Sequence, residues 1–86
     1  MTMPYTVYLK RSVEKELEEL SEKLHDRIIE ALLSLKNNPY PRNVKKLHGR
    51  EGFRLRVGNY RVLYTVDEAG KKIDVVSVAD RKEVYR

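Results

Sequence analysis

The stretch that decides the fold is FRLRVGNYRVLY, residues 53–64. Apolar residues occupy alternate positions on both sides of Gly58-Asn59, and this alternation is typical of two half-buried β-strands. A glycine followed by an asparagine suits the two-residue turn of a β-hairpin. The stretch therefore predicts an antiparallel hairpin with one apolar and one polar face. On the apolar face, the expected cross-strand pairs are Leu55 with Val62 and Phe53 with Tyr64.

The polar face of this hairpin gathers positive charge. If Val57 and Tyr60 flank the turn, Arg56 lies opposite Arg61, with Arg54 two residues along. Like charges directly opposite each other destabilise a sheet, so three arginines on one patch indicate that an anion binds there. Guanidinium groups match phosphate oxygens and stabilise the charge of a phosphoryl transition state. The alternative is a solvated face whose arginines pair with acidic residues elsewhere in the chain.

The segment before the hairpin predicts a strand and then helix. Residues 5–9 alternate apolar and polar side chains, as a short strand does. Ser12 is expected to cap the helix that follows. The apolar positions at helical spacing are Val13, Leu17, Leu20, Leu24, Ile28, Leu32 and Leu35. This pattern predicts one helix, or two helices broken near Ser21, ending at the asparagines and prolines of residues 37–41.

The remaining segments complete a small α+β fold. Residues 42–50 form a basic segment before the hairpin, and a last strand is expected over residues 73–78 after a polar turn. The expected order is a strand, two helices and three strands, which corresponds to one small antiparallel β-sheet packed against an N-terminal helical hairpin. At 86 residues, the chain forms a single domain, residues 1–86.

Charge distribution indicates a polyanionic partner. The net charge is +5 and the sequence pI is about 9.6. Residues 1–41 carry a net −1 and residues 42–86 a net +6, so the positive field belongs to the second half, which favours nucleic acid, an acidic protein segment or an anionic membrane surface as partner.

Composition excludes several classes of protein. There are no cysteines, which excludes disulfides and cysteine-ligated metals and fits a reducing cytoplasm. The two histidines, His25 and His48, are too few for a probable metal site, so no metal and no cofactor are expected. No apolar run is long enough to span a membrane and no secretion signal is evident, so a cytoplasmic location is expected.

The end of the sequence adds to the basic surface. RKEVYR, residues 81–86, brings three cations and a tyrosine ring that is able to stack on a base of single-stranded RNA. A packing role for this tyrosine is the alternative. Lys45 and Lys46, just before the hairpin, either form a solvated run or contact backbone phosphates.

Three segments together resemble the RelE/ParE superfamily of toxins from toxin–antitoxin pairs: KLHG at residues 46–49, the hairpin stretch, and RKEVY at residues 81–85. The resemblance covers nearly the whole chain and implies a RelE-like microbial RNase fold. For the RelE branch it implies metal-independent, ribosome-dependent endoribonuclease activity: messenger RNA is cut in the ribosomal A site when a 2′-hydroxyl attacks the scissile phosphate, which inhibits translation.

The resemblance also implies roles for individual residues. Arg54 and Arg56 stand where RelE has catalytic lysines, Arg61 and Arg81 would hold and neutralise the phosphate, and Tyr85 would stack on or orient the target nucleotide. Arg81 is also a candidate for protonating the leaving group. Further RNA contacts are expected from the flanking cations Lys45, Lys46, Lys82 and Arg86.

The general base is left open by two departures from the family pattern. Arginine is a poor base because its pKa lies far above neutrality, so arginines at the lysine positions do not supply one. Many relatives also have Gly-His-Arg where this chain has Ala79-Asp80-Arg81. Asp80 is one candidate substitute, and dependence on positioning by the ribosome is expected.

The resemblance implies binding partners and leaves two alternative functions open. The expected partners are an acidic antitoxin that covers the basic face, the ribosome and mRNA, and operator DNA only through the antitoxin; no membrane is involved. One alternative is a ParE-like toxin that poisons DNA gyrase without nuclease activity. Another is a non-catalytic RNA-binding domain.

Overall fold

The fold consists of two helices and a five-stranded sheet. The computed structural model describes residues 4–80. The elements, in chain order, are β1 (Thr6–Leu9), α1 (Arg11–Glu18), α2 (Glu22–Leu35), β2 (Val44–Lys46), β3 (Phe53–Val57), β4 (Tyr60–Asp67) and β5 (Lys72–Asp80). This confirms the predicted α+β class, with one strand more than expected.

The strands are ordered β1-β5-β4-β3-β2 across the sheet. Strands β3 to β5 pair antiparallel, as predicted, and β2 pairs antiparallel with β3. The edge strand β1 pairs parallel with β5, which corrects the expectation of a wholly antiparallel sheet. The additional strand, β2, lies within the segment that the sequence marked only as basic. Its three residues, Val44–Lys46, include two lysines and show no alternation of their own, so its extended conformation depends on pairing with β3.

The predicted register of the β3–β4 hairpin is confirmed. Val57 pairs with Tyr60 beside the turn, and Arg56 pairs with Arg61. Gly58 in the turn has a φ of +58°, a left-handed conformation that glycine adopts without strain. The predicted last strand is longer than expected because β4 and β5 continue to pair beyond residues 73–78 as far as Lys72 and Asp80.

The helices confirm the predicted break and correct the predicted cap. Ser21 caps α2, where its Oγ accepts a hydrogen bond of 3.3 Å from the amide of Leu24. Ser12 was wrongly predicted as the first cap, because α1 begins at Arg11 and its N-cap is Lys10. The amide of Lys10 donates to the carbonyl of Val75 at 3.2 Å, so pairing with β5 fixes where the chain turns into the helix.

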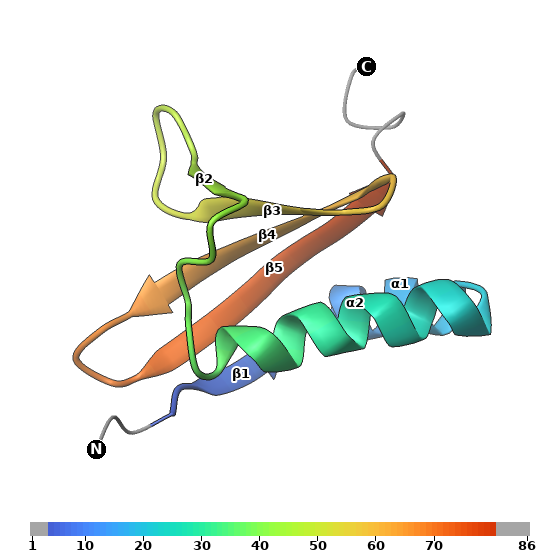
Figure 1. The fold of residues 1–86 in the computed structure, drawn as a ribbon, viewed down its shortest axis with the longest axis horizontal. Coiled ribbons are helices and arrows are strands. Elements are labelled where there is room, and N and C mark those ends of the chain that lie inside the picture. Colours follow the sequence, from blue (N-terminus) through green and yellow to red (C-terminus); the bar gives the residue numbers. More distant parts are fainter. Residues whose placement is uncertain (1–3, 81–86) are drawn as a thin grey trace.

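Both helices pack on one face of the sheet, α1 against β5 and α2 against β1 and β3 (Figure 1). The core between these layers contains alternate residues of the strands. It also contains those predicted apolar residues of the two helices that the fold buries fully. Its most buried large side chains are Tyr64, Ile28, Leu35, Ile73, Val13, Val62 and Val75. Neither α1 nor α2 covers the other face of β3 and β4, and neither is long enough to cross a membrane.

Candidate nucleic-acid interface

The helix-free face of the sheet carries the predicted arginine cluster. Cross-strand pairing fixes which side chains are neighbours there, and they form two rows that run from β5 towards β2. One row contains Ala79, Arg61 and Arg56, and the next contains Ser77, Leu63, Arg54 and Lys45. Three predicted arginines and one predicted lysine therefore share a single surface.

The three arginines are presented to solvent to different extents. Arg56 is exposed and Arg54 is partly buried, whereas Arg61 is only 8% exposed and interacts with other groups. Arg56 and Arg54 are therefore placed to meet a large ligand directly, while Arg61 contributes charge from the floor of the surface.

The two interpretations of the arginines predict different contacts. Arginines that pair with acidic residues would contact carboxylates of this chain, whereas an anion-binding face would leave its arginines without such contacts. Among residues 4–80, the Asp26 carboxylate contacts the ring of His25 at 3.3 Å, and the Glu68 carboxylate lies 3.9 Å from the Nζ of Lys71. No carboxylate of this part of the chain pairs with Arg54 or Arg56. The positive charge of these two arginines is thus available to a ligand, which supports an anion-binding role.

Two hollows lie side by side on this face. The first, which we name the Arg56 hollow, has a volume of about 400 Å³ and is lined by Asn43, Lys45, Arg54, Arg56 and Gly58. The second, the Leu63 hollow, has a volume of about 130 Å³ and is lined by Leu47, Arg54, Arg61, Leu63, Ser77 and Ala79. Arg54 lines both hollows. The sequence interpretation missed Asn43, Leu47, Leu63, Ser77 and Ala79, because only the pairing of four strands brings them together.

Lys46 does not share the arginine surface. Successive side chains of a strand point to opposite faces, and Lys46 pairs with Phe53 whereas Lys45 pairs with Arg54. Lys46 instead lines a separate hollow that also includes Tyr40 and Phe53. Its predicted contact with RNA would therefore be made from the other side of β2.

Asp80, considered as a general base, does not lie with the arginines. It pairs with Tyr60, while its neighbour Ala79 pairs with Arg61. Alternation along β5 therefore directs Asp80 towards the helix-covered face, and its proposed substitution for the missing histidine is not supported by the geometry.

The other predicted residues of the site, Arg81, Lys82, Tyr85 and Arg86, lie outside the described residues. The last described residue, Asp80, pairs with Tyr60 next to the hairpin turn. Within residues 4–80, no three His, Cys, Asp or Glu side chains are grouped to hold a metal ion.

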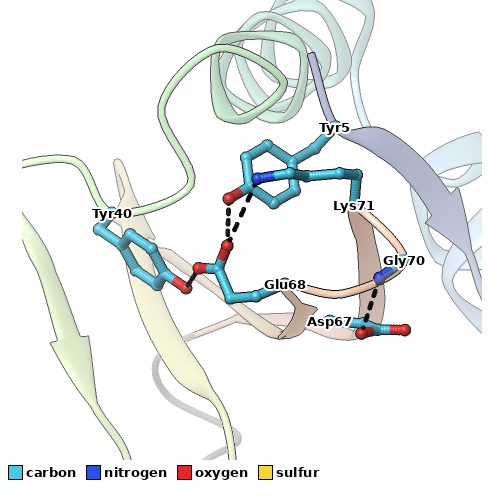
Figure 2. A network of polar contacts seen from close by, with 6 residues as sticks. All are labelled: Tyr5, Tyr40, Asp67, Glu68, Gly70 and Lys71. Atoms are coloured by element: carbon cyan, nitrogen blue, oxygen red, sulfur yellow. Dashed lines mark hydrogen bonds and ion pairs between the residues drawn. The ribbon is translucent and has the colours of Figure 1, made fainter. Parts of the chain in front are cut away.

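A second polar cluster lies at the opposite end of β4, as Figure 2 shows. The Glu68 carboxylate accepts hydrogen bonds from the hydroxyls of Tyr5 and Tyr40, and the Lys71 Nζ lies 3.9 Å from Glu68 Oε1. Lys71 Nζ also lies 4.8 Å from the centroid of the Tyr5 ring. These contacts join the segment before β1, the α2–β2 connection and the β4–β5 turn.

The hydrogen bonds of this cluster shift the pKa values of its members. Donation from Tyr40, and secondarily from Tyr5, lowers the pKa of Glu68 below its ordinary value of 4.5. The bond to the carboxylate, aided by burial, raises the pKa of Tyr40 to about 12. Both shifts favour a carboxylate bound to neutral phenols at neutral pH, which indicates a role in holding the three segments together.

Comparison with known proteins places this geometry in a family. Residues 7–85 match the family model described as "ParE toxin of type II toxin-antitoxin system, parDE". The chain belongs to this toxin family. A curated relative, Toxin RelE of Mycobacterium tuberculosis, is 29% identical over 85 residues, which covers 96% of this chain and 88% of the relative. Putative toxin RelE1 of Methanocaldococcus jannaschii is 30% identical over 88 residues, covering 98% of each.

Solved structures of toxins in this family have the same fold. The archaeal RelE–RelB complex from Pyrococcus horikoshii matches with a TM-score of 0.84 and 33% identity, covering 92% of this chain and 97% of that chain. These similarities confirm the RelE/ParE superfamily, with a RelE-like branch, and the RelE-like fold. The YoeB/ParE toxin from Agrobacterium tumefaciens, at 16% identity and a TM-score of 0.76, shares the fold.

Proposed function

We propose that this toxin is a ribosome-dependent endoribonuclease that cuts mRNA in the A site. The observation that carries the proposal is the grouping of Lys45, Arg54, Arg56 and Arg61 on one helix-free face, with no acid of residues 4–80 paired to Arg54 or Arg56. A surface of this kind attracts a polyanion and matches phosphate geometry. The relatives named RelE support the RelE branch of the superfamily, for which the sequence resemblance implies RNA as the substrate.

The proposed reaction is an internal transfer at phosphorus. The 2′-hydroxyl attacks the neighbouring phosphate, the bond from phosphorus to the 5′-oxygen breaks, and the products are a 2′,3′-cyclic phosphate and a 5′-hydroxyl. Negative charge builds on the phosphate oxygens in the transition state, and fixed cations stabilise it. We assign this stabilisation to Arg54 and Arg56, with Arg61 beneath them and Arg81 as a further cation. Tyr85 orients the target nucleotide by stacking.

The proton of the 2′-hydroxyl needs an acceptor that arginine does not provide, so we assign it to solvent water, while the leaving 5′-oxygen takes a proton from Arg81 or from water. Asp80 faces the other side of the sheet. We therefore propose that catalysis depends on the ribosome, which positions the mRNA so that in-line attack contributes much of the rate.

An acidic antitoxin is the proposed regulatory partner. The relatives of known structure from P. horikoshii, M. tuberculosis and Methanococcus jannaschii were solved as toxin–antitoxin complexes. The net charge of +6 on residues 42–86 favours an acidic segment that covers the arginine face and excludes mRNA. Operator DNA would be contacted through the antitoxin.

A ParE-like gyrase poison is the second candidate, because the matching family model is named for the ParE toxin. Gyrase poisoning does not require cations arranged around a scissile phosphate. Substitution separates the candidates: Arg56→Ala should slow mRNA cutting by about 10²–10³-fold if the toxin is a nuclease and leave gyrase inhibition largely unchanged if it is a gyrase poison.

The direct test is brief induction of the toxin in a bacterial host, followed by primer extension on a translated message with and without a block of translation. The proposal predicts new 5′ ends at codon positions in frame, which disappear when translation is blocked. Absence of new ends, together with gyrase-dependent linearised plasmid, would establish the second candidate instead.

A further inference from the structure

The Leu63 hollow contains an apolar floor where a polar surface is expected. Leu63 lies on the helix-free face of β4, with Arg54 on one side and Ser77 on the other. Leu63 and Leu47 are partly buried, yet neither belongs to the core cluster formed with the helices. Neither leucine is therefore accounted for by packing of the sheet against α1 and α2.

The hollow is lined by apolar, positively charged and hydroxyl-bearing side chains. Leu47, Leu63 and Ala79 provide apolar contacts, while Arg54 and Arg61 bring positive charge and Ser77 a hydroxyl. A nucleobase has flat faces that pack on apolar side chains or guanidinium planes, polar edges that form hydrogen bonds, and a phosphate attached through the ribose. An apolar protein side chain would use the floor but would gain nothing from the two arginines.

The size of the hollow and its neighbour limit what it accepts. At about 130 Å³ it is smaller than the adjoining Arg56 hollow of about 400 Å³, so we assign one ring system to it and the phosphate to its larger neighbour. The Arg56 hollow adjoins it through Arg54. Neighbouring strands are about 4.8 Å apart, so a base on β4 and a phosphate over β3 are separated by a distance that one ribose spans.

We propose that the Leu63 hollow binds one unstacked nucleobase of single-stranded RNA, whose adjoining phosphate lies in the Arg56 hollow. Leu63 and Leu47 contact the face of the base, Ser77 meets its polar edge, and Arg54 bridges base and phosphate. This inference rests on the proposed function and deepens it, because it assigns a base-binding subsite beside the phosphate-binding arginines.

The test uses a short, labelled single-stranded oligonucleotide with 2′-O-methyl groups, which prevent cutting by 2′ attack. Fluorescence anisotropy measures its affinity for the toxin, and a series of oligonucleotides removes one base at a time to leave an abasic position. With the unmodified toxin, one abasic position should weaken binding about tenfold, the order expected for one stacked base, while the others have little effect.

A variant that fills the hollow provides the second arm. Ala79→Leu should lower the affinity for the intact oligonucleotide about tenfold. This variant should then bind the intact oligonucleotide and the one with the sensitive abasic position equally well, because both changes act on the same contact. Ala69→Leu, the same substitution in the exposed β4–β5 turn, is the matched control and should leave both values unchanged. Circular dichroism checks that each variant is folded, and the abasic series requires no variant at all.

The outcomes distinguish this inference from the proposed function. If the toxin binds the intact oligonucleotide but every abasic version binds equally well, the base subsite is overturned and the nuclease proposal stands. If Ala79→Leu weakens binding of the antitoxin and leaves RNA binding unchanged, the hollow is a protein-docking site and the inference is overturned. If the toxin binds no RNA and cuts no mRNA, both are overturned.

Discussion

The two faces of strand β3 differ in what their side chains do. Leu55 is 3% exposed and faces the helices, whereas its neighbours Arg54 and Arg56 point to the helix-free face. The same contrast continues on β4, where Val62 is fully buried and Leu63 lines a surface hollow. Residues adjacent in sequence therefore lie in different environments, the core on one face and the proposed ligand-binding surface on the other, and substitutions one position apart should have different consequences.

The largest effect on folding is expected from the helix-covered face. Leu55→Ala should lower the free energy of unfolding by about 2–5 kcal/mol, because it removes a buried side chain and leaves a cavity between sheet and helices. Chemical denaturation measures the change. A loss below about 0.5 kcal/mol, the range of ordinary surface substitutions, would show that the two faces do not differ in this way.

A smaller loss is expected where the core face meets the α2–β2 connection. The buried Tyr64 hydroxyl donates a hydrogen bond of 2.6 Å to the carbonyl of Pro39. Tyr64→Phe should cost about 1–3 kcal/mol in unfolding free energy, because a buried acceptor loses its partner. Tyr8→Phe, at an exposed tyrosine, is the matched control, and equal costs for the two substitutions would contradict the account.

On the helix-free face, stability should change little and RNA affinity more. Arg54→Ala should change unfolding free energy by no more than about 0.5 kcal/mol. It should also reduce the slope of log affinity against log salt for single-stranded RNA by about 0.7, the contribution of one phosphate contact. Arg11→Ala, an exposed arginine on α1, is the control and should preserve the slope.

The smallest effect is expected at the cluster around Glu68. Because hydrogen bonds from the tyrosines lower its folded-state pKa below 4.5, the carboxylate stabilises the fold above that pH and loses this contribution as pH falls through the lowered value. The difference in unfolding free energy between the unmodified toxin and Glu68→Gln should be constant near neutrality and shrink below pH 4.5. A difference that grows on acidification would contradict the assigned direction.

Sequence predicted the parts of the molecule that depend on local patterns. Alternation in residues 53–64 was sufficient for the β3–β4 register, since any shift by one residue would expose Leu55 and bury Arg56. The break near Ser21 was predicted from the helical spacing of the apolar residues, whereas the capping of α2 by Ser21 was found only in the structure. The family resemblance was also correct, because residues 7–85 match the family model although the motifs that suggested it begin only at residue 46.

The features that sequence did not predict depend on contacts between distant segments. β2 is a strand because β3 pairs with it, and α1 begins at Arg11 because β5 holds Lys10. The Glu68 cluster joins three segments far apart in the chain. The Leu63 hollow likewise requires side chains from three strands and the segment after β2, and no single-strand pattern marks it.

We propose that the helix-free face of β3 and β4 acts on mRNA. The most direct measurement is single-turnover cleavage of A-site mRNA on purified ribosomes by the unmodified toxin, by Arg56→Ala and by Arg11→Ala. Removal of one transition-state cation should slow cleavage by about 10²–10³-fold in Arg56→Ala, with Arg11→Ala unchanged. Equal rates for all three proteins, or equal losses in the two variants, would contradict the claim.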